Sequence, residues 1–333
     1  MMNAIGGYFE KEPRTIEEHA IPQKDGILLN TARNAFEYIL RSIPNLRGVY
    51  LPYYTCNVML EPLKRLFGVS FAFYHITHQL EIAEDFDLGE GEYIVVNNYF
   101  GIKDEYVRRM AEKYKDRLIV DNAQAFYAPV IDGIKAIYSA RKFFGVPDGG
   151  IAYLPNDNKQ WEWYETDDSV DRLAHLRIRL EQGPEAGYAK YREAEDKLDY
   201  QPIMQMSAYT HDALSHIDYD IAQQVRRRNF RILHEALSDY NVLPIPDIES
   251  FACPMVYPFL DVRKCDWRYK MKEQRIFIPK FWPNVISYGH FNYEAMLADR
   301  IMPLPIDQRY NEEDMKRIIE IILNRDNGTN SNI

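Results

Sequence analysis

The chain has 333 residues, of which 46% are hydrophobic and 27% are charged, enough apolar surface for a sizeable core. Its 40 lysines and arginines stand against 50 aspartates and glutamates, and the formal net charge of -10 argues against general nucleic-acid binding. Three scattered cysteines exclude a disulfide framework and a zinc cage, and they favour a reducing compartment. No apolar stretch is long enough to span a bilayer, and residues 1–14 do not form a signal peptide, so we expect a cytoplasmic protein without a membrane partner.

Helix and strand patterns alternate through the first half of the chain. Apolar residues at helical spacing predict helices over 31–42, 58–67 and 103–115. Short apolar runs predict strands over 48–51, 69–76, 93–96, 118–120 and 135–139. Strands that alternate with helices of this length are typical of βαβ units, so we predict an α/β fold with a mostly parallel sheet.

The second half of the chain has a different pattern. Residues 161–199 are charged and helical, with a break at Gly183-Pro184, and one long helix is predicted over 209–237. That helix carries three consecutive arginines, Arg226 to Arg228, for which we expect solvent or dimer contacts because adjacent residues do not share a helix face. An amphipathic helix is predicted over 312–323. We therefore expect a large α/β domain over 1–237, a smaller C-terminal α+β domain over 238–325 and a disordered tail over 326–333.

Two chemically distinctive side chains follow neighbouring predicted strands. The strand over 118–120 runs directly into Asp121, with Gln124 three residues on. The strand over 135–139 leads to Lys142 and a turn that ends in Gly149-Gly150. Because ligands of a parallel α/β sheet bind at the carboxyl ends of its strands, we expect Asp121 and Lys142 to share a site.

A phosphate site is expected where the first helix begins. Thr31, Ala32 and Arg33 open this helix, whose free N–H groups and positive dipole end suit a phosphate. An acid, a lysine and a helix start of this kind together suit pyridoxal 5′-phosphate (PLP). The amine of Lys142 would form a Schiff base with its aldehyde. The carboxylate of Asp121 would keep its pyridine nitrogen protonated, so that the ring accepts electrons.

Four segments resemble the DegT/StrS-type sugar aminotransferases, which belong to the aspartate aminotransferase class, or fold type I. They are LNTARNAFEYIL (29–40), LPYYTCNV (51–58), VDNAQAF (120–126) and SARKFFGVPDGG (139–150). The most specific pieces are the Asp-x-x-Gln of Asp121 and Gln124 and the Lys-x6-Gly-Gly that begins at Lys142. The resemblance implies that Lys142 holds PLP, that Asp121 pairs with the pyridine nitrogen and that Gln124 lies near the ring. It also implies that Thr31 and the backbone of Ala32 and Arg33 hold the phosphate, in a homodimer with sites at the subunit interface.

The sequence departs from this family in the phosphate region. A serine that family members commonly place five residues before the lysine is Ile137 here. Ser139 lies on the same strand face by the period-two rule, and we predict that it takes over the phosphate contact. The glycine at the family's helix start is Ala32.

Two further departures concern the surroundings of the cofactor. An Asn-Tyr-Arg that many members contribute to the neighbouring subunit's site reads Ile203-Met204-Gln205 here. The aromatic residue that often covers the ring corresponds to Cys56, with Tyr54 close by, and we predict that Tyr54 and Cys56 contact the cofactor. The PLP core is thus retained while the residues around it differ.

Less specific interpretations remain for several of these residues. Asp121 also suits the N-cap position of a helix, and a threonine at a helix start, such as Thr31, is an ordinary N-cap. The eight histidines show no metal-ligand spacing, so no metal site is predicted.

The leading hypothesis is a PLP-dependent aminotransferase acting on a nucleotide-linked keto sugar, with glutamate or glutamine as donor, in surface-polysaccharide or deoxyaminosugar biosynthesis. The alternatives are a protein that binds PLP or a nucleotide sugar without transaminating, and a PLP enzyme with an amino-acid substrate.

Overall fold

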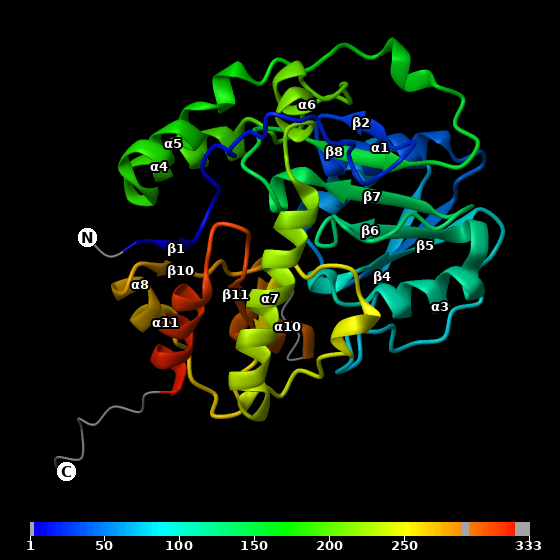
Figure 1. Cartoon of the computed structure of the whole chain (residues 1–333). Helices are drawn as coiled ribbons and strands as arrows, with labels where there is room; N and C mark the ends of the chain where they lie inside the picture. Colours follow the sequence, from blue (N-terminus) through cyan, green and yellow to red (C-terminus); the bar gives the residue numbers. More distant parts are fainter. Residues whose placement is uncertain (1–2, 288–292, 324–333) are drawn as a thin grey trace.

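A sheet of seven strands forms the centre of the computed structural model, which describes residues 3–287 and 293–323 (Figure 1). Strands β3 to β7 are parallel, whereas β8 is antiparallel to both its neighbours, β7 and β2. This arrangement confirms the predicted mostly parallel sheet. In spatial order, the strands are β2 (Ile27–Leu29), β8 (Gly150–Tyr153), β7 (Lys135–Ser139), β6 (Leu118–Asn122), β5 (Glu92–Asn97), β3 (Gly48–Pro52) and β4 (Ser70–Tyr74).

Helices pack on both faces of this sheet. Helix α1 lies against β7 and β8, and α3 lies against β5 and β6. Alternate residues of one strand serve the two faces, since Ile119 belongs to the core under α1 while Val120 belongs to the core on the opposite face. The α-helices of the described residues are α1 (Ala32–Ser42), α2 (Leu60–Arg65), α3 (Asp104–Tyr114), α4 (Ala174–Gln182), α5 (Pro184–Asp196), α6 (Ala208–Leu214), α7 (Tyr219–Leu237), α8 (Arg268–Glu273), α9 (Asn284–Ser287), α10 (Tyr293–Arg300) and α11 (Glu312–Leu323).

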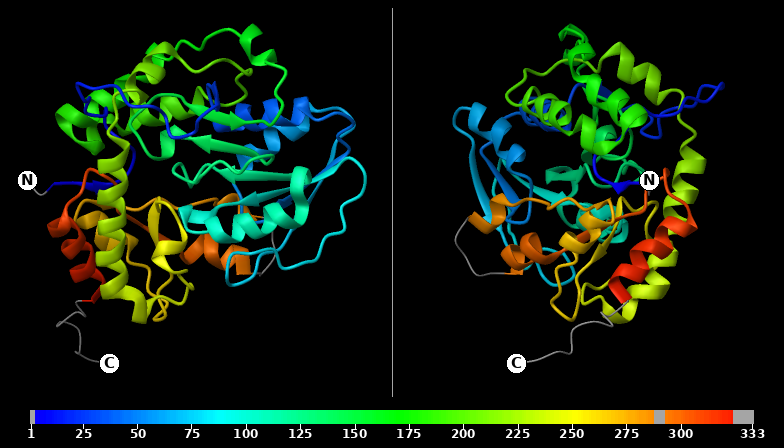
Figure 2. Two further views of the ribbon diagram at one scale, coloured as in Figure 1. Left: turned by 45° about the vertical axis from the view of Figure 1, so that its right-hand side comes forward. Right: turned by 90° about the vertical axis from the view of Figure 1, so that its left-hand side faces the viewer.

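The C-terminal elements gather below the sheet in the view of Figure 1, and the beginning of the chain lies among them. Strand β9 (Val256–Phe259) pairs antiparallel with β11 (Met302–Pro305), and α11 packs on α7. Both further views show α7 beside α11 along its lower part (Figure 2). Strand β1 (Ile5–Gly6) pairs in parallel with β10 (Ile276–Phe277). The N-terminal segment therefore joins the C-terminal elements before it crosses to the sheet.

The helix predicted over 209–237 is wrong, because the structure divides it into α6 and α7. The side chain of Asp218 accepts a hydrogen bond from the Ile221 amide at 2.9 Å and so caps a new helix. The predicted break at Gly183-Pro184 is confirmed between α4 and α5. The division into domains over 1–237 and 238–325 stays a prediction, and the tail predicted over 326–333 lies outside the described residues.

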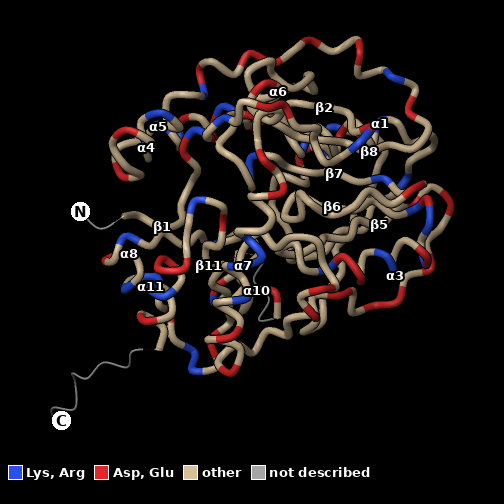
Figure 3. Tube along the Cα trace, in the orientation of Figure 1, with Lys and Arg blue, Asp and Glu red and all other residues tan. Residues whose placement is uncertain are grey.

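Charged residues of both signs alternate along the chain trace (Figure 3). Over the described parts of the chain, no helix is long and apolar enough to cross a membrane. The same residues contain no group of three or more side chains that could hold a metal ion. Neither observation adds a partner to those that the sequence suggests.

Candidate active site

Asp121 lies near the carboxyl end of β6, in the middle of the sheet. Its side chain is 8% exposed, and the Ala123 amide donates a hydrogen bond of 2.8 Å to its Oδ1. Burial raises the pKa of Asp121 above the usual carboxyl value, whereas the positive charge of Lys142 and the Ala123 hydrogen bond lower it. Lys142 is thus near enough for its charge to act on Asp121, and the cofactor site that the two are expected to share stays a prediction.

Lys142 ends a short 3-10 helix (Ala140–Lys142) directly after β7. Two backbone hydrogen bonds fix the turn that follows it. The Ala140 amide donates to the Gly149 carbonyl at 3.0 Å, and the Gly149 amide donates to the Asn30 carbonyl at 2.7 Å. The turn that carries Lys142 is thereby tied to the residue immediately before the Thr31 cap of α1.

The beginning of α1 forms a backbone cradle beside this turn. Thr31 is the N-cap, and its hydroxyl accepts a hydrogen bond of 3.1 Å from the Asn34 amide. The amides of Ala32 and Arg33 have no acceptor inside the helix because they belong to its first turn. A Cβ atom on Gly150 would lie 2.1 to 2.4 Å from backbone atoms of Thr31 and Ala32. Only glycine therefore lets β8 approach the helix start this closely.

Ser139 faces the same cradle. It pairs with Gly150 across the antiparallel strands β7 and β8, and residues opposite each other in such a pair project to the same face. Since the missing Cβ of Gly150 points at the Thr31 and Ala32 backbone, the Ser139 side chain points to this side too. Ile137, two residues earlier, is fully buried in the core under α1. Ser139 therefore lies on the side where it is predicted to replace the family's serine, whose position is occupied here by Ile137. The contact of Ser139 with a phosphate stays a prediction.

The Arg33 side chain is already engaged. Its Nη1 lies 2.6 Å from Glu61 Oε2 and 3.0 Å from Asp199 Oδ1. Arg33 can therefore serve an anion at the helix start through its backbone amide, as predicted, while its guanidinium ties α1 to α2.

Gln124 contributes a hydrogen-bond donor that has no acceptor among the described residues. Its Oε1 accepts from the Phe100 amide at 2.9 Å, and its buried Nε2 has no partner. An orphaned buried donor costs on the order of 1–3 kcal/mol, so a group that offers an acceptor would stabilise this position. The site thus combines a buried carboxylate, a neighbouring lysine, an unpaired amide and a cradle of backbone amides at a helix start. This set of groups fits PLP.

Tyr54 and Cys56 follow β3, two strands away from β6. The Tyr54 ring is fully buried and stands edge-on to Trp282, with ring centroids 4.5 Å apart. Cys56 is half-buried and directly precedes a 3-10 turn over Asn57–Met59. Both belong to the correct edge of the sheet, and their contact with a cofactor stays a prediction.

Two residues near the site were missed from the sequence. Asn97 ends β5 beside Asp121 in the sheet register, and its buried Oδ1 has no partner in the described structure. The signal was available, because Asn97 follows a buried strand as Asp121 does. Arg226 was expected at the surface, and this expectation is wrong: the side chain is 0% exposed and donates to backbone carbonyls. Helix α7 is covered at this point by segments distant in the sequence, which a local pattern does not reveal.

Replacing Gly150 with alanine is expected to destroy the cradle. The new methyl group would overlap the Thr31 and Ala32 backbone, so β8 and the start of α1 must separate. We expect PLP affinity to fall by on the order of 10²-fold with a loss of stability of about 1–3 kcal/mol. Titration with PLP and thermal unfolding measure the two effects. The control is Gly133→Ala: unlike Gly150, Gly133 has a positive φ, so this variant adds backbone strain but no overlap, since no atom lies within 4 Å of the added carbon. Equal PLP affinity in the two variants would contradict the cradle.

Comparison with known proteins gives a clear structural likeness and no sequence match. No family model and no curated protein matches the chain. A putative sugar aminotransferase from Streptococcus pneumoniae, solved in its PMP-form, superposes with a TM-score of 0.62 at 14% identity, over 95% of this chain and 90% of that one. The aminotransferase TlmJ from Streptoalloteichus hindustanus gives a TM-score of 0.60 at 16% identity, over 95% and 91% of the two chains.

A third likeness bears on the resemblance seen in the sequence. A DegT DnrJ EryC1 StrS aminotransferase from Brucella abortus gives a TM-score of 0.55 at 17% identity, over 89% of this chain and 84% of that one. The matches extend over most of both chains, so they concern the whole architecture and not one motif. The predicted fold class is confirmed: the chain has the fold of the PLP-dependent sugar aminotransferases, fold type I.

Proposed function

We propose that the chain is a PLP-dependent aminotransferase. The observation that carries this proposal is the meeting of Asp121 and Lys142 at adjacent strand ends, beside the start of α1, in a fold shared with such enzymes. When bound, PLP supplies an aldehyde and an electron-accepting ring. The amine of Lys142 would hold the aldehyde and would carry a proton to and from the α-carbon of the amino donor. The carboxylate of Asp121 holds a proton at the pyridine nitrogen.

The remaining site residues hold the cofactor in place. The amides of Ala32 and Arg33, the Thr31 cap and the Ser139 hydroxyl surround the proposed phosphate position. The buried Nε2 of Gln124, which has no partner among the described residues, would offer a hydrogen bond to the ring. Tyr54 and Cys56 would contact the cofactor from the other side of the site. These residues bind and orient the cofactor, whereas Lys142 and Asp121 carry out the proton chemistry.

The proposed substrate is a nucleotide-linked keto sugar, with glutamate or glutamine as the amino donor. The support is that solved structures sharing this fold are described as sugar aminotransferases. The reaction would serve surface-polysaccharide or deoxyaminosugar biosynthesis in the cytoplasm. The sequence resemblance over 29–40, 120–126 and 139–150 points to the same class of reaction.

A second candidate is a protein that binds PLP or a nucleotide sugar without transaminating. It is favoured by the amides of the region that replaces the family's Asn-Tyr-Arg. The Gln205 side chain donates to the Tyr164 carbonyl at 2.8 Å, and the Gln201 side chain donates to the Lys197 carbonyl at 2.7 Å. Both amides thus already donate within their own chain, which leaves them less donor capacity for a neighbouring subunit.

The deciding experiment follows the visible absorption of the PLP-loaded protein. Glutamate or glutamine should convert the bound cofactor to its pyridoxamine form, and a nucleotide-linked keto sugar should return it to the aldehyde form. No conversion by any amino donor would favour the binding protein. Conversion that an α-keto acid reverses and keto sugars do not would favour an amino-acid substrate.

We expect the protein to be a homodimer with its sites at the subunit interface. A site on strand ends is open on one side, and proton transfer at a carbon atom needs water excluded from the cleft. Large exposed side chains suited to a partner surface occur in the segment between β8 and α6, where Trp163 is 83% and Tyr200 is 78% exposed. Light scattering at micromolar concentration should give twice the mass of one chain. A stable monomer that completes the reaction with glutamate would contradict a shared site.

A further inference from the structure

Arg226 is a buried cation whose hydrogen bonds go to uncharged oxygen atoms. The side chain is 0% exposed and lies in the middle of α7. Within the described part of the chain, no carboxylate oxygen lies within 4.0 Å of its guanidinium. Burying a charge without a direct ion pair is unfavourable, so the hydrogen bonds of Arg226 and the more distant charges of Glu12 and Asp307 must compensate for its burial.

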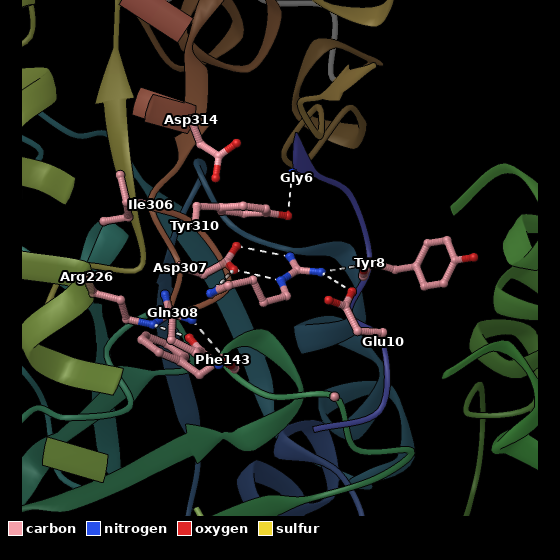
Figure 4. Close-up of polar contacts among 12 residues, drawn as sticks. Gly6, Tyr8, Glu10, Phe143, Arg226, Ile306, Asp307, Gln308, Tyr310 and Asp314 are labelled. Atoms are coloured by element: carbon pink, nitrogen blue, oxygen red, sulfur yellow. Dashed lines mark hydrogen bonds and ion pairs between the residues drawn. The ribbon is translucent and has the colours of Figure 1, made fainter. Parts of the chain in front are cut away.

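One side of this guanidinium holds the residue that follows Lys142. Its Nη2 donates to the Phe143 carbonyl at 3.0 Å, and the guanidinium lies 4.6 Å from the centre of the Phe143 ring. The same carbonyl accepts a second hydrogen bond of 2.9 Å from Gln308 Nε2. Gln308 is in turn held by Arg226, whose Nε donates to its Oε1 at 3.0 Å. Figure 4 shows Arg226 and Gln308 converging on Phe143.

The other side of the guanidinium leads to Gln124 through two residues, Met255 and Phe100. Arg226 Nη1 donates to the Met255 carbonyl at 3.0 Å. The Met255 amide donates to the Phe100 carbonyl at 2.8 Å, and the Phe100 amide donates to Gln124 Oε1 at 2.9 Å. A close backbone contact locks this arrangement, since a Cβ on Gly101 would lie 2.8 Å from the Gln124 carbonyl oxygen.

We propose that Arg226 is a positioning residue that fixes Lys142 and Gln124 relative to each other from outside the cofactor site. Its planar fork reaches the Lys142 turn and the Gln124 support at once. These follow the paired strands β7 and β6, and among the described residues no hydrogen bond joins the one directly to the other. A lysine at this position would keep the positive charge and lose the fork. The inference rests on the proposed function in one respect only: the measurement of covalent PLP attachment assumes that the protein binds PLP through Lys142.

The test compares Arg226→Lys with Arg227→Lys. Arg227 lies on the same helix and also donates to backbone carbonyls, those of Phe251 and Ala252, at 2.7 and 3.0 Å. It makes no hydrogen bond to Phe143. Unlike Arg226, it is partly exposed and also pairs with Glu249 at 2.8 Å. The change therefore controls for the loss of an arginine that donates to backbone carbonyls on this helix, away from the Lys142 turn.

Three measurements separate positioning from general damage. The first is the rate at which PLP attaches to Lys142, trapped with borohydride and located by peptide mass. The second is the affinity for pyridoxamine 5′-phosphate, which has no aldehyde and binds without attachment. The third is the acetylation rate of Lys142 relative to Lys135 in the cofactor-free protein, both read from the same digest.

Misplacing a reacting group by about 1 Å can cost on the order of 10²-fold, so we expect Arg226→Lys to slow attachment by at least about tenfold. The acetylation ratio should change severalfold, and pyridoxamine 5′-phosphate affinity should stay close to that of the wild type. Arg227→Lys should alter none of these values. Equal attachment and acetylation in both variants would overturn the proposal, as would a parallel loss of attachment and pyridoxamine 5′-phosphate affinity.

Two further outcomes remain decisive. If Arg226→Lys does not fold, Gln308→Leu removes the second donor to the Phe143 carbonyl and should slow attachment in the same direction. Unchanged PLP attachment and unchanged acetylation of Lys142 in that variant would overturn the proposal. If the wild type never attaches PLP to Lys142, the proposed function fails. The acetylation ratio in the cofactor-free protein then still decides whether Arg226 positions Lys142.

Discussion

Replacing Lys142 with alanine is expected to abolish covalent attachment of PLP and to lower turnover by at least about 10³-fold, because attachment and proton transfer both need its amine. Borohydride reduction of the wild type should leave the pyridoxyl group on the peptide that contains Lys142. The cofactor-free variant should unfold at nearly the wild-type temperature, since the Lys142 side chain makes no hydrogen bond or ion pair among the described residues, and alanine leaves the backbone of the turn unchanged.

Lys135 supplies the matched control for this experiment. It begins the same strand β7, and its Nζ donates to the Asp116 carbonyl at the opposite end of the sheet. Lys135→Ala should keep covalent attachment and turnover. A pyridoxyl group found on a lysine other than Lys142, or on none with PLP in excess, would contradict the assignment.

Replacing Asp121 with asparagine is expected to lower turnover by on the order of 10²-fold or more while PLP still binds. The amide keeps the shape and still accepts the Ala123 hydrogen bond, but it lacks the charge that holds the pyridine nitrogen protonated. Steady-state kinetics and PLP titration measure the two quantities. Near-normal turnover would mean that Asp121 is only a local cap.

The same substitution is expected to stabilise the cofactor-free protein at neutral pH. Burial raises the pKa of Asp121, so its contribution to the free energy of unfolding is largest in acid and is lost as pH rises through the folded-state pKa. Asparagine never ionises and avoids this loss. The gain in melting temperature should therefore shrink as pH is lowered. A variant less stable than the wild type at neutral pH would contradict this account.

Asp104 provides a control for the effect of removing a buried carboxyl group. It begins α3, burial raises its pKa as well, and it accepts hydrogen bonds from Asn98 Nδ2 and the Ala252 amide. No described contact links it to Lys142. Asp104→Asn should leave turnover close to that of the wild type, so a loss specific to Asp121→Asn reports on the cofactor.

The parts of the fold that could be predicted are those specified by neighbouring residues. Strand β7 and helix α11 have the predicted bounds, and Thr31 caps α1 as expected. The break between α6 and α7 was not predicted, because residues 215–218 contain neither glycine nor proline and only the Asp218 cap marks the new helix. Strand β8 was missed because Gly149-Gly150 indicates a turn, although the strand that begins there pairs with the nearby β7 and the distant β2.

The candidate site shows the same division. Asp121, Lys142 and Thr31 follow from strand ends and a helix start, which are local features. The role of Arg226 depends on Phe143, Met255 and Gln308, which three separate regions of the chain bring to one guanidinium. A sequence pattern shows that a helix exists, whereas the partners of its buried face depend on the tertiary fold.

The pairing of β1 with β10 has a consequence for biosynthesis. Ile5 is made about 270 residues before its partner Ile276. At typical translation rates of about 5–20 residues per second, the N-terminal segment waits on the order of tens of seconds before its strand can form. The Glu10 carbonyl packs against Gly145 in the Lys142 turn, so this turn also acquires its cover late. Ribosome-bound chains that stop before β10 should therefore expose the segment around residues 5–12 to proteases, and completed chains should protect it.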